Sequence, residues 1–281
     1  MTKPKTILVT GGAGFIGSHL VDVLLAAGHT VVVIDDLSLG RKDNLKEALQ
    51  SPKFLFYEKD ILHRKSLDHI FATHAFDVVF HLAANSDIQK GAKDPDVDHR
   101  LTFLTTYEVL KCMKEYKVPE IIFASTSAVY GESTEVLSET FGPCLPISMY
   151  GANKLAAEGY VSAYAENYGI KSWIFRFPNV VGERFTHGII FDFIHKLRKS
   201  PQELEVLGNG EQFKPYLYVK DLIIGILFCW EKAQNKINLF NLGADSRTKV
   251  KDIAQWVLEA VGSKATIKYT GGDRGWVGDV P

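Results

Sequence analysis

The first 178 residues alternate short apolar segments with longer stretches whose apolar positions recur at helical spacing. The apolar segments are four to six residues long and rich in β-branched side chains, which is typical of strands buried on both faces of a parallel sheet. The predicted strands are Thr6–Thr10, Thr30–Asp35, Phe54–Tyr57, Val78–Leu82, Ile121–Ser125 and Ser172–Phe177. This alternation predicts an α/β fold, a doubly wound parallel sheet with helices on both faces.

Three helices are predicted between these strands. Met149–Tyr168 begins after Ser148, whose hydroxyl can accept a hydrogen bond from a first-turn amide, and it ends before Gly169. Glycine closes helices because it takes the left-handed conformation easily. The other two helices are predicted over Phe15–Ala27 and Leu101–Tyr116.

After Pro178 the pattern changes, with shorter elements and recurring glycines and prolines. It predicts three helices and two strands, which are Gly188–Lys199, Asp221–Glu231 and Thr248–Val261, then Ile237–Gly243 and Thr266–Tyr269. We therefore predict two domains, one over residues 1–178 and a smaller C-terminal α/β lobe over residues 179–281. Part of residues 219–243 is expected to return to the main sheet.

Composition narrows the class of protein. With 46% hydrophobic residues, 23% charged residues and a net charge of −1, the chain has no feature that favours nucleic acid or a membrane surface as partner. Its longest apolar run, Leu222–Trp230, is about half of a membrane span. No C-x-x-C occurs, so we expect reduced thiols in a cytoplasmic protein at Cys112, Cys144 and Cys229. No metal is predicted, because ligand spacing with a matching carboxylate is missing at His63, His69 and His74.

A glycine-rich loop joins the first strand to the first helix. Gly11 allows a tight turn, Gly14 lets the backbone approach a pyrophosphate, and Gly17 lets the helix pack on the strand. The phosphates would then meet the helix N-terminus, so the loop predicts a bound dinucleotide. Asp35 lies 18 residues after Gly17, where a carboxylate accepts hydrogen bonds from ribose hydroxyls and repels a 2′-phosphate. Asp36 adds a second negative charge, so the sequence favours NAD over NADP.

Tyr150 and Lys154 are four residues apart on a predicted helix, so both can point into one site. A free phenol has a pKa near 10, too high for a base at neutral pH. A lysine cation and an oxidised nicotinamide beside it would favour the phenolate. A shift of roughly 3 units corresponds to about 4 kcal/mol. This pair suits removal of a hydroxyl proton while hydride leaves for NAD.

Seven motifs occur in the order in which one family carries them. The chain resembles the extended short-chain dehydrogenase/reductase family, in its NAD-dependent sugar-nucleotide epimerase/dehydratase branch typified by UDP-glucose 4-epimerase. The resemblance covers nearly the whole chain and implies a Rossmann fold with bound NAD. The motifs are the glycine loop Thr10–Gly17, Val33–Ser38, Asp60–Ile61, His81–Ala84, Ser125–Gly131, Tyr150–Lys154 and Arg176–Gly182.

The resemblance implies a role for each matching residue. Thr126 resembles the hydroxyl that binds the reacting sugar hydroxyl, Tyr150 the general base, and Lys154 the residue that binds the nicotinamide ribose. Tyr150, Lys154 and the following residues match cofactor-binding positions: Gly11, Gly14, Phe15, Ile16, Gly17, Asp35, Asp36, Leu37, Ser38, Asp60, Ile61, Leu82, Ala83, Ala84 and Phe177. The predicted substrate-binding residues are Ser86, Thr126, Asn179, Lys214 and Arg274.

The two positions after Thr126 separate reactions within this family. Its 4,6-dehydratases carry Asp-Glu there, because elimination of water needs a further acid and base, and its decarboxylating members keep the Glu. This chain has Ser127 and Ala128, and alanine cannot transfer a proton. Epimerisation or simple oxidation and reduction remain, and the resemblance implies a transient 4-keto sugar.

Two departures from the family pattern affect the substrate lobe. Lys214 stands where an arginine is usual, so a phosphate would meet a point charge without the bidentate fork. Trp276 stands where a second arginine is usual, and Arg274 could replace that cation. His187 lies at the start of the helix expected to line the sugar pocket, where contact with the substrate is one reading and a surface position is the favoured one.

The sequence therefore predicts an NAD-dependent nucleotide-sugar epimerase, with 4-epimerisation of a UDP-hexose favoured. The alternatives are a reductase or epimerase of a GDP- or CDP-linked sugar, or a non-catalytic NAD-binding protein of the same fold. The resemblance implies a homodimer that pairs the helices Asp98–Tyr116 and Met149–Tyr168 of each subunit. Because relatives usually continue beyond the position of Pro281, the substrate lobe is expected to be truncated at its C-terminus.

Overall fold

The computed structural model describes residues 3–133, 135–186, 188–245 and 247–272. Its main sheet has seven strands, and every neighbouring pair is parallel. The strand order reverses on either side of β1, which makes the sheet doubly wound and confirms the predicted fold class. In spatial order the strands are β11 (Ile237–Asn241), β6 (Lys171–Phe177), β5 (Glu120–Thr126), β4 (Val78–His81), β1 (Thr6–Thr10), β2 (Thr30–Asp35) and β3 (Phe54–Glu58).

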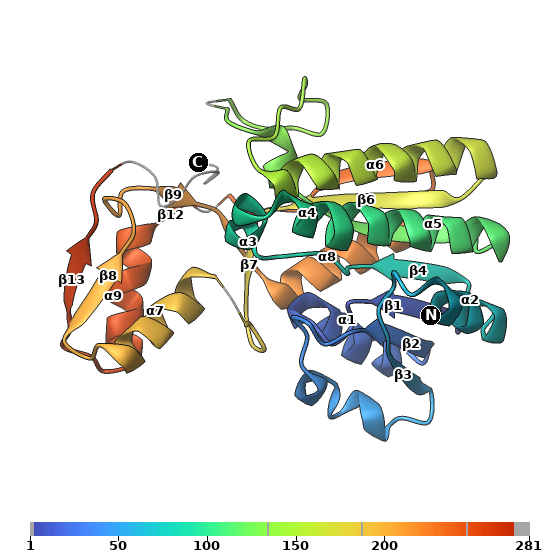
Figure 1. The fold of residues 1–281 in the computed structure, drawn as a ribbon, viewed down its shortest axis with the longest axis horizontal. Helices are drawn as coiled ribbons and strands as arrows, with labels where there is room; N and C mark the ends of the chain where they lie inside the picture. The colour runs from blue at the N-terminus through green and yellow to red at the C-terminus, as the bar shows by residue number, and fades with distance from the viewer. Residues whose placement is uncertain (1–2, 134, 187, 246, 273–281) are drawn as a thin grey trace.

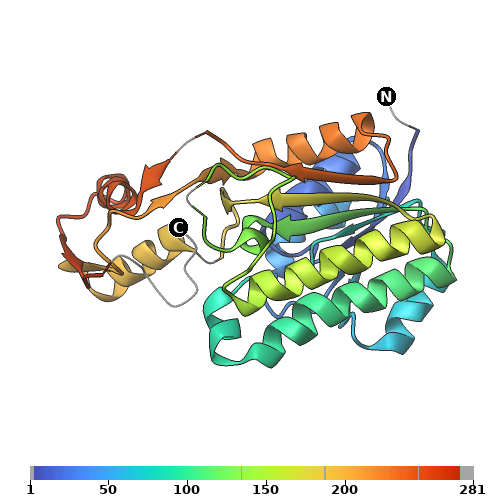
Figure 2. The same cartoon turned by 90° about the horizontal axis from the view of Figure 1, so that it is seen from above.

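Helices cover both faces of this sheet because successive strand residues point to opposite sides. On β1, Ile7 and Val9 belong to one apolar core and Leu8 to the other. The two layers of helices enclose the sheet in Figures 1 and 2. The first core is covered by α1 (Phe15–Ala26) and α8 (Val219–Lys232), and the second by α2 (Arg64–Thr73), α5 (Thr105–Glu115) and α6 (Met149–Tyr168).

The six strands predicted for the first part of the chain are confirmed, and no end moves by more than one residue. Helix α6 has the predicted bounds, with Ser148 Oγ accepting a hydrogen bond from the Gly151 amide at 3.0 Å. Gly169 follows it in the left-handed conformation. Local capping chemistry therefore fixes both ends of the helix that carries Tyr150 and Lys154.

The prediction of a single helix over residues 101–116 is wrong for the first turn, which is π-helical. The structure has α3 (Ile88–Lys93) and α4 (Pro95–Asp98), then a π-helical segment over His99–Leu104 that leads into α5. Thr105 Oγ1 donates to the Leu101 carbonyl at 2.8 Å and Thr106 Oγ1 to the Thr102 carbonyl at 2.7 Å. Such hydroxyls compete for the backbone carbonyls and distort a regular helix.

The smaller C-terminal unit has an apolar core of its own and projects from the main body in Figure 1. Two helices predicted after Pro178 shift: α8 of the main body begins earlier, at Val219, and α9 of the smaller unit begins later because Thr248–Lys249 forms a strand before it. The elements of the smaller unit are α7 (Ile189–Lys199), β8 (Glu203–Val206), α9 (Val250–Ala260) and β13 (Thr266–Tyr269). Short strand pairs connect it to the main body: β7 (Asn179–Val181) with β10 (Tyr216–Tyr218), and β9 (Phe213–Lys214) with β12 (Thr248–Lys249).

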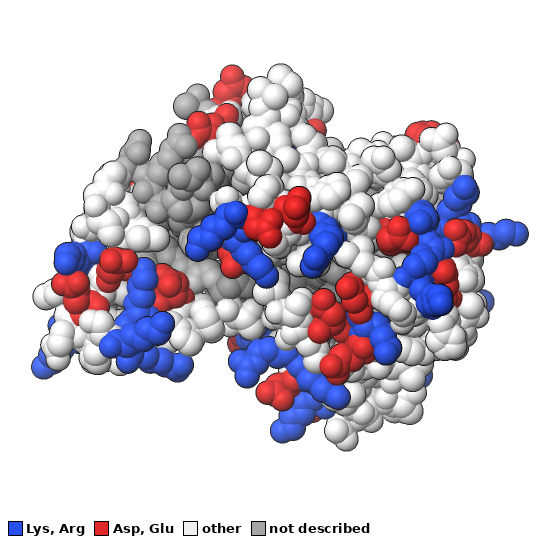
Figure 3. All heavy atoms as spheres, in the orientation of Figure 1, with Lys and Arg blue, Asp and Glu red and all other residues white. Residues whose placement is uncertain are grey.

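The described surface mixes both signs of charge. Figure 3 shows acidic and basic side chains lying beside one another over the visible face. Within the described ranges, no helix combines the length and apolar character that crossing a membrane requires.

The carboxyl ends of the parallel strands meet at one edge of the sheet. Thr10, Asp35, His81, Thr126 and Phe177 are the last residues of β1, β2, β4, β5 and β6. The chain leaves this edge after β6 to enter β7 and the smaller unit. Ligands of open α/β sheets bind at this position, so the fold itself brings the predicted site residues together.

Candidate active site

A cleft of about 820 Å³ lies at the carboxyl edge of the sheet and extends to the smaller unit. All described residues that the sequence predicted as site residues line it, except Leu37. Leu37 packs against the apolar core on the α1 side, and its amide donates to Asp35. Arg274, Trp276 and His187 lie outside the described residues. Residues far apart in the sequence therefore form one continuous candidate site.

The glycine loop wraps tightly around the start of α1. Gly11 has a φ of +70°, and a Cβ on Gly17 would lie 2.2 Å from the Gly11 carbonyl oxygen, so neither position has room for a side chain. Gly14 is the N-cap of α1 and provides no side-chain acceptor for the first-turn amides. These amides and the helix dipole form an anion site at the wall of the cleft.

Asp35 is fixed beside this anion site. Its Oδ2 accepts a hydrogen bond from the Ala13 amide and its Oδ1 one from the Leu37 amide, both at 2.9 Å. Gly40 approaches so closely that a Cβ there would lie 2.8 Å from Asp35 Oδ1. Burial raises the pKa of Asp35, and the two amides oppose that shift. Each carboxylate oxygen keeps a lone pair that can accept a ligand hydroxyl.

Thr126, Tyr150 and Lys154 meet where β5 ends and α6 begins. Lys154 is 2% exposed, and its Nζ donates to the Ala124 carbonyl at 2.6 Å. The same Nζ lies 6.0 Å from the centre of the Tyr150 ring. Thr126 Oγ1 accepts from the Ala128 amide at 3.1 Å, which orients the hydroxyl.

Burial determines the protonation of this group in the protein alone. It raises the pKa of Tyr150 to about 12, while hydrogen bonding with Thr126 lowers it and the Asp98 charge raises it further. Burial also lowers the pKa of Lys154 to about 7, against the opposing charges of Glu158 and Asp98. The expected stabilisation of the phenolate by Lys154 together with an oxidised nicotinamide stays a prediction, because these pKa values describe the protein without a nicotinamide. Removal from water disfavours both charged forms and is the largest cause of both shifts.

A buried ion pair under α6 was not predicted from the sequence. Arg176 donates through Nη2 to Glu158 Oε2 at 2.6 Å and through Nε to Glu158 Oε1 at 3.0 Å, and both side chains are 7% exposed. Ser125 Oγ also donates to Glu158. The Arg176 guanidinium stacks 4.7 Å from the centre of the Tyr130 ring, whose hydroxyl donates to Asn241 at 2.7 Å. This network joins α6 to β5, β6 and β11.

The smaller unit contributes a second group that was not predicted. Asp192, His195 and Lys196 on α7 line the cleft, and they share a helix face because they are three and four residues apart. Lys196 Nζ lies 3.0 Å from Asp192 Oδ2. Helical periodicity could have revealed this polar face, but only after α7 had been placed at the cleft. Asn179 and Lys214 reach the same cleft from β7 and β9.

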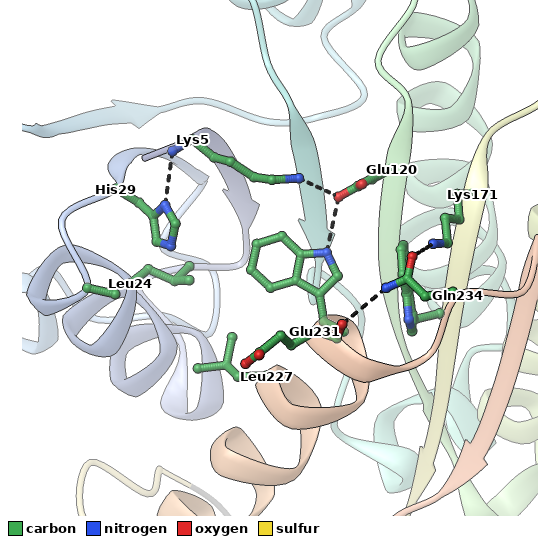
Figure 4. Close-up of a pocket in the computed structure, with 11 residues that line it drawn as sticks. Lys5, Leu24, His29, Glu120, Lys171, Leu227, Glu231 and Gln234 are labelled. Carbon is green, nitrogen blue, oxygen red and sulfur yellow. Dashed lines mark hydrogen bonds and ion pairs between the residues drawn. The ribbon is translucent and has the colours of Figure 1, made fainter. Parts of the chain in front are cut away.

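A smaller cavity of about 280 Å³ lies at the opposite, amino edge of the sheet (Figure 4). Three of its charged groups, Lys5, Glu120 and Lys171, form hydrogen bonds or ion pairs with other residues of the cavity. Lys5 Nζ lies 2.8 Å from Glu120, Trp230 Nε1 donates to the same carboxylate at 3.1 Å, and Lys171 Nζ donates to Gln234 at 2.6 Å. It contains no residue that the sequence predicted, so the larger cleft is the candidate active site.

The described part of the chain has no group of three or more His, Cys, Asp or Glu side chains that could hold a metal ion. The polar groups that line the cleft include the Thr126 hydroxyl, the Tyr150 phenol, the Lys154 amino group and the Asp35 carboxylate. Groups of these kinds can bind and exchange protons.

Comparison with known proteins identifies the family that carries this site. Residues 7–243 match the NAD dependent epimerase/dehydratase family. The chain belongs to this family. It is 32% identical over 274 residues to the UDP-glucose 4-epimerase of Halalkalibacterium halodurans, covering 91% of this chain and 80% of that protein.

Solved structures agree with this assignment. The UDP-glucose 4-epimerase of Thermotoga maritima, solved with UDP-glucose, has a TM-score of 0.88 and 34% identity, covering 98% of this chain and 88% of the other. The UDP-glucuronic acid 4-epimerase of Bacillus cereus, solved with UDP-glucuronic acid and NAD, has a TM-score of 0.87 and 30% identity, covering 98% and 89%. The protein is therefore similar to epimerases along almost its whole length.

NAD, the cofactor of this epimerase/dehydratase family, fits the residues present. The uncapped first turn of α1 suits its pyrophosphate, and the fixed Asp35 carboxylate suits the adenosine ribose. Lys154 and Tyr150 line the other end of the same cleft, where the nicotinamide half would lie.

We predict that Gly17→Ala weakens NAD binding at least about tenfold, which corresponds to about 1.4 kcal/mol. The new Cβ would lie 2.2 Å from the Gly11 carbonyl oxygen and 2.8 Å from Gly12 Cα, so the loop must move. Gly28→Ala at the other end of α1 is the matched control. That site has a φ of +86° and open space, so the substitution costs about 1 kcal/mol of stability without affecting NAD. Titration calorimetry measures both, and equal affinities for Gly17→Ala and the wild type would refute the assignment.

We predict that Lys154→Met raises the free energy of unfolding by about 1–3 kcal/mol below pH 7, because it removes a buried charge. The pKa of Lys154 falls from 10.5 to about 7 on folding. Below pH 7 both folded and unfolded chains carry the proton, and the cost of burying it is fully present. Between about pH 7 and 10.5 the folded protein releases this proton, and the advantage of methionine declines.

Urea denaturation at pH 6 and pH 9 measures this difference. Lys232→Met is the control, since that side chain is 59% exposed and its removal leaves stability nearly unchanged at both pH values. A Lys154→Met protein less stable than the wild type at pH 6 would contradict the prediction.

Proposed function

We propose that this protein is an NAD-dependent epimerase that inverts carbon 4 of a UDP-linked hexose or hexuronate. The observation that carries the proposal is that Thr126, Tyr150 and Lys154 all line the cleft, and that Ser127 and Ala128 directly follow Thr126 in the chain. The trio can bind a sugar hydroxyl and exchange its proton. The two following residues lack the acid and base that elimination needs.

Family membership alone does not decide the reaction. The chain is also 31% identical to a UDP-glucuronic acid decarboxylase of Arabidopsis thaliana and 30% identical to a dTDP-D-glucose 4,6-dehydratase of Dictyostelium discoideum. Ala128, which is buried at 7% exposure beside the cleft, cannot transfer a proton as their chemistry requires. The UDP-sugar epimerases among the similar proteins support the remaining reaction.

The side chains divide the catalytic work. Tyr150 removes the proton of the sugar 4-hydroxyl and later returns it, and Thr126 hydrogen-bonds the same oxygen. Bound NAD would supply the reversible hydride chemistry and a positive ring charge that favours the Tyr150 phenolate. Lys154 would hold a hydroxyl of its ribose and add its own charge near the phenol. Inversion at carbon 4 requires the sugar to turn within the cleft between removal and return of the proton.

We assign cofactor and substrate to different parts of the chain. Residues 1–178, with part of 219–243, bind NAD, and residues 179–281 bind the nucleotide sugar. Ser86, Asn179 and Lys214 contact the substrate, and Arg274 supplies a further cation. The separate core of the smaller unit and the pairing of β11 with β6 support this division.

We also propose a homodimer in the cytoplasm. Met149, Tyr160 and Tyr168 on α6 are 50%, 43% and 48% exposed, which leaves an aromatic surface next to α5. Tyr160 packs edge-on against Phe103 and Tyr107 with ring centres 5.0 and 5.7 Å away. Pairing of α5 and α6 with the same helices of a second copy would bury this surface. The three free cysteines support a reducing compartment.

We predict that the wild type interconverts UDP-glucose with UDP-galactose, or UDP-glucuronate with its 4-epimer, and that Tyr150→Phe reduces turnover at least about a thousandfold while NAD stays bound. The expectation follows because phenylalanine keeps the ring but cannot carry the proton.

Chromatographic separation of epimers measures turnover, with the N-acetylated UDP-sugars included. Near-normal turnover by Tyr150→Phe would sink the mechanism. A net change in NADH would indicate a reductase, and binding of NAD without turnover would indicate a binding protein.

We predict that Tyr160→Glu halves the mass measured by sedimentation, because it places a charge in the proposed dimer surface. Phe228→Glu is the control, since Phe228 is 60% exposed on α8 at the opposite face of the sheet. The control should sediment like the wild type. If the wild type sediments as a monomer, or if Tyr160→Glu remains dimeric, the α5–α6 pairing is incorrect.

A further inference from the structure

Asp98 is a fully buried carboxylate that the mechanism above does not use. It ends α4, directly before the π-helical segment, and its exposed fraction is 0%. Its Oδ1 accepts a hydrogen bond from Asn85 Nδ2 at 2.8 Å. Its Oδ2 has no hydrogen-bond partner among the described residues. A buried oxygen without a partner costs free energy, and such atoms recur at functional sites.

The surrounding helices are built to admit this carboxylate. Gly91 on α3 lies against it so closely that a Cβ at this position would be 1.7 Å from Asp98 Oδ2. Any side chain on residue 91 would therefore displace the free oxygen. Gly91 therefore lies closest to Oδ2, which has no partner, and not to Oδ1, which accepts the hydrogen bond from Asn85.

The segments around Asp98 contact the helix that carries Tyr150 and Lys154. Helices α3 and α4 and the π-helical segment all pack against α6. Burial raises the pKa of Asp98, the charge of Asp87 at the start of α3 raises it further, and the hydrogen bond from Asn85 and the charge of Lys154 on α6 lower it. The Asp98 charge raises the pKa of both Tyr150 and Lys154.

The other buried carboxylate near Lys154 is that of Glu158, and its charge is paired with Arg176. Glu158 is held by the two hydrogen bonds from Arg176. His81 faces Lys154 from β4, and burial lowers its pKa to about 3, so it is neutral at pH 7. Within the described part of the chain, Asp98 is the carboxylate near Lys154 that no cation pairs with.

We propose that Asp98 is a positioning residue that acts through space on Lys154 and keeps its buried ammonium protonated during catalysis. The proposal rests on the proposed function in assigning a catalytic use to Lys154. The Asp98 charge also disfavours the Tyr150 phenolate, so it sets the pH range in which ammonium and phenolate coexist.

Asp98→Asn tests the proposal because it removes the charge, while its amide oxygen can still accept from Asn85. Both limbs of the pH profile of turnover with UDP-glucose should move to lower pH by about half a unit or more. The acid limb reports the pKa of the Tyr150 phenol and the alkaline limb reports the pKa of the Lys154 ammonium. The Asp98 charge raises both pKa values, so its removal lowers both. A purely structural role would lower the rate without moving either limb, which would overturn the proposal.

Asp96→Asn is the matched control, because Asp96 lies on the same turn of helix but is exposed. It should leave both limbs in place. Gly91→Ala is the second variant. By displacing the free oxygen while the charge remains, it should move the limbs in the same direction by a smaller amount. Limbs that stay fixed in Gly91→Ala would count against the proposal.

Nuclear magnetic resonance tests the proposal without turnover. In protein labelled at the lysine side chains, the Lys154 signal is the one missing from Lys154→Met. Its titration should move to lower pH in Asp98→Asn and stay unchanged in Asp96→Asn. In the wild type, the labelled Asp98 carboxylate should be ionised at pH 7. If Asp98 is protonated at pH 7, the proposal is overturned, and this result can be obtained even if Asp98→Asn fails to fold. Absence of epimerisation overturns only the proposed function.

Discussion

The buried ion pair between Glu158 and Arg176 is the interaction on which the active site depends. Glu158 lies one turn after Lys154 on α6, and Arg176 lies on β6 next to the strand that carries Thr126. Their hydrogen bonds, together with the one from Ser125, fix the helix to the sheet at the level of the catalytic side chains. Removal of one partner of such a pair costs about 3–5 kcal/mol, because the other charge stays buried. A pair of this kind contributes precise placement more than net stability.

The same burial creates a conflict that the site must resolve. The proposed catalysis uses a phenolate and an ammonium, yet burial favours the phenol and the amine, with pKa values of about 12 for Tyr150 and about 7 for Lys154. Charges placed near the pair are more effective for the same reason, since a medium of low dielectric screens them weakly. A cofactor with a positive ring would favour the Tyr150 phenolate, whereas the Asp98 carboxylate favours the Lys154 ammonium and opposes the phenolate. In the protein alone, burial has the largest effect on both pKa values.

The sequence predicted the sheet well, and most of the residues that it predicted for the cofactor line one cleft, for physical reasons. Buried parallel strands are short apolar runs, and their carboxyl ends must share one edge, so the strand pattern alone brings Gly11, Asp35 and Thr126 together. The ion pair of Glu158 with Arg176 and the free oxygen of Asp98 were not predicted, because neither has a local sequence signal. Each depends on helix packing across the sheet. The π-helical turn likewise arises from threonine hydroxyls, whose competition with the backbone a hydrophobic pattern does not record.

The substrate half was predicted less completely because it is assembled from separate segments. The residues proposed to bind NAD lie on a loop, a strand end and a helix start that follow one another in a single unit, so local rules describe them. The part of the cleft proposed for the sugar nucleotide is lined by β7, α7 and β9, whose relative positions depend on how the smaller unit rests against the sheet. That unit has its own core, so its polar face on α7 can vary without disturbing Glu158 and Arg176. The architecture thus separates the proposed proton chemistry at α6 from the proposed recognition of the sugar, so a substitution on α7 can alter the cleft without altering the packing of α6.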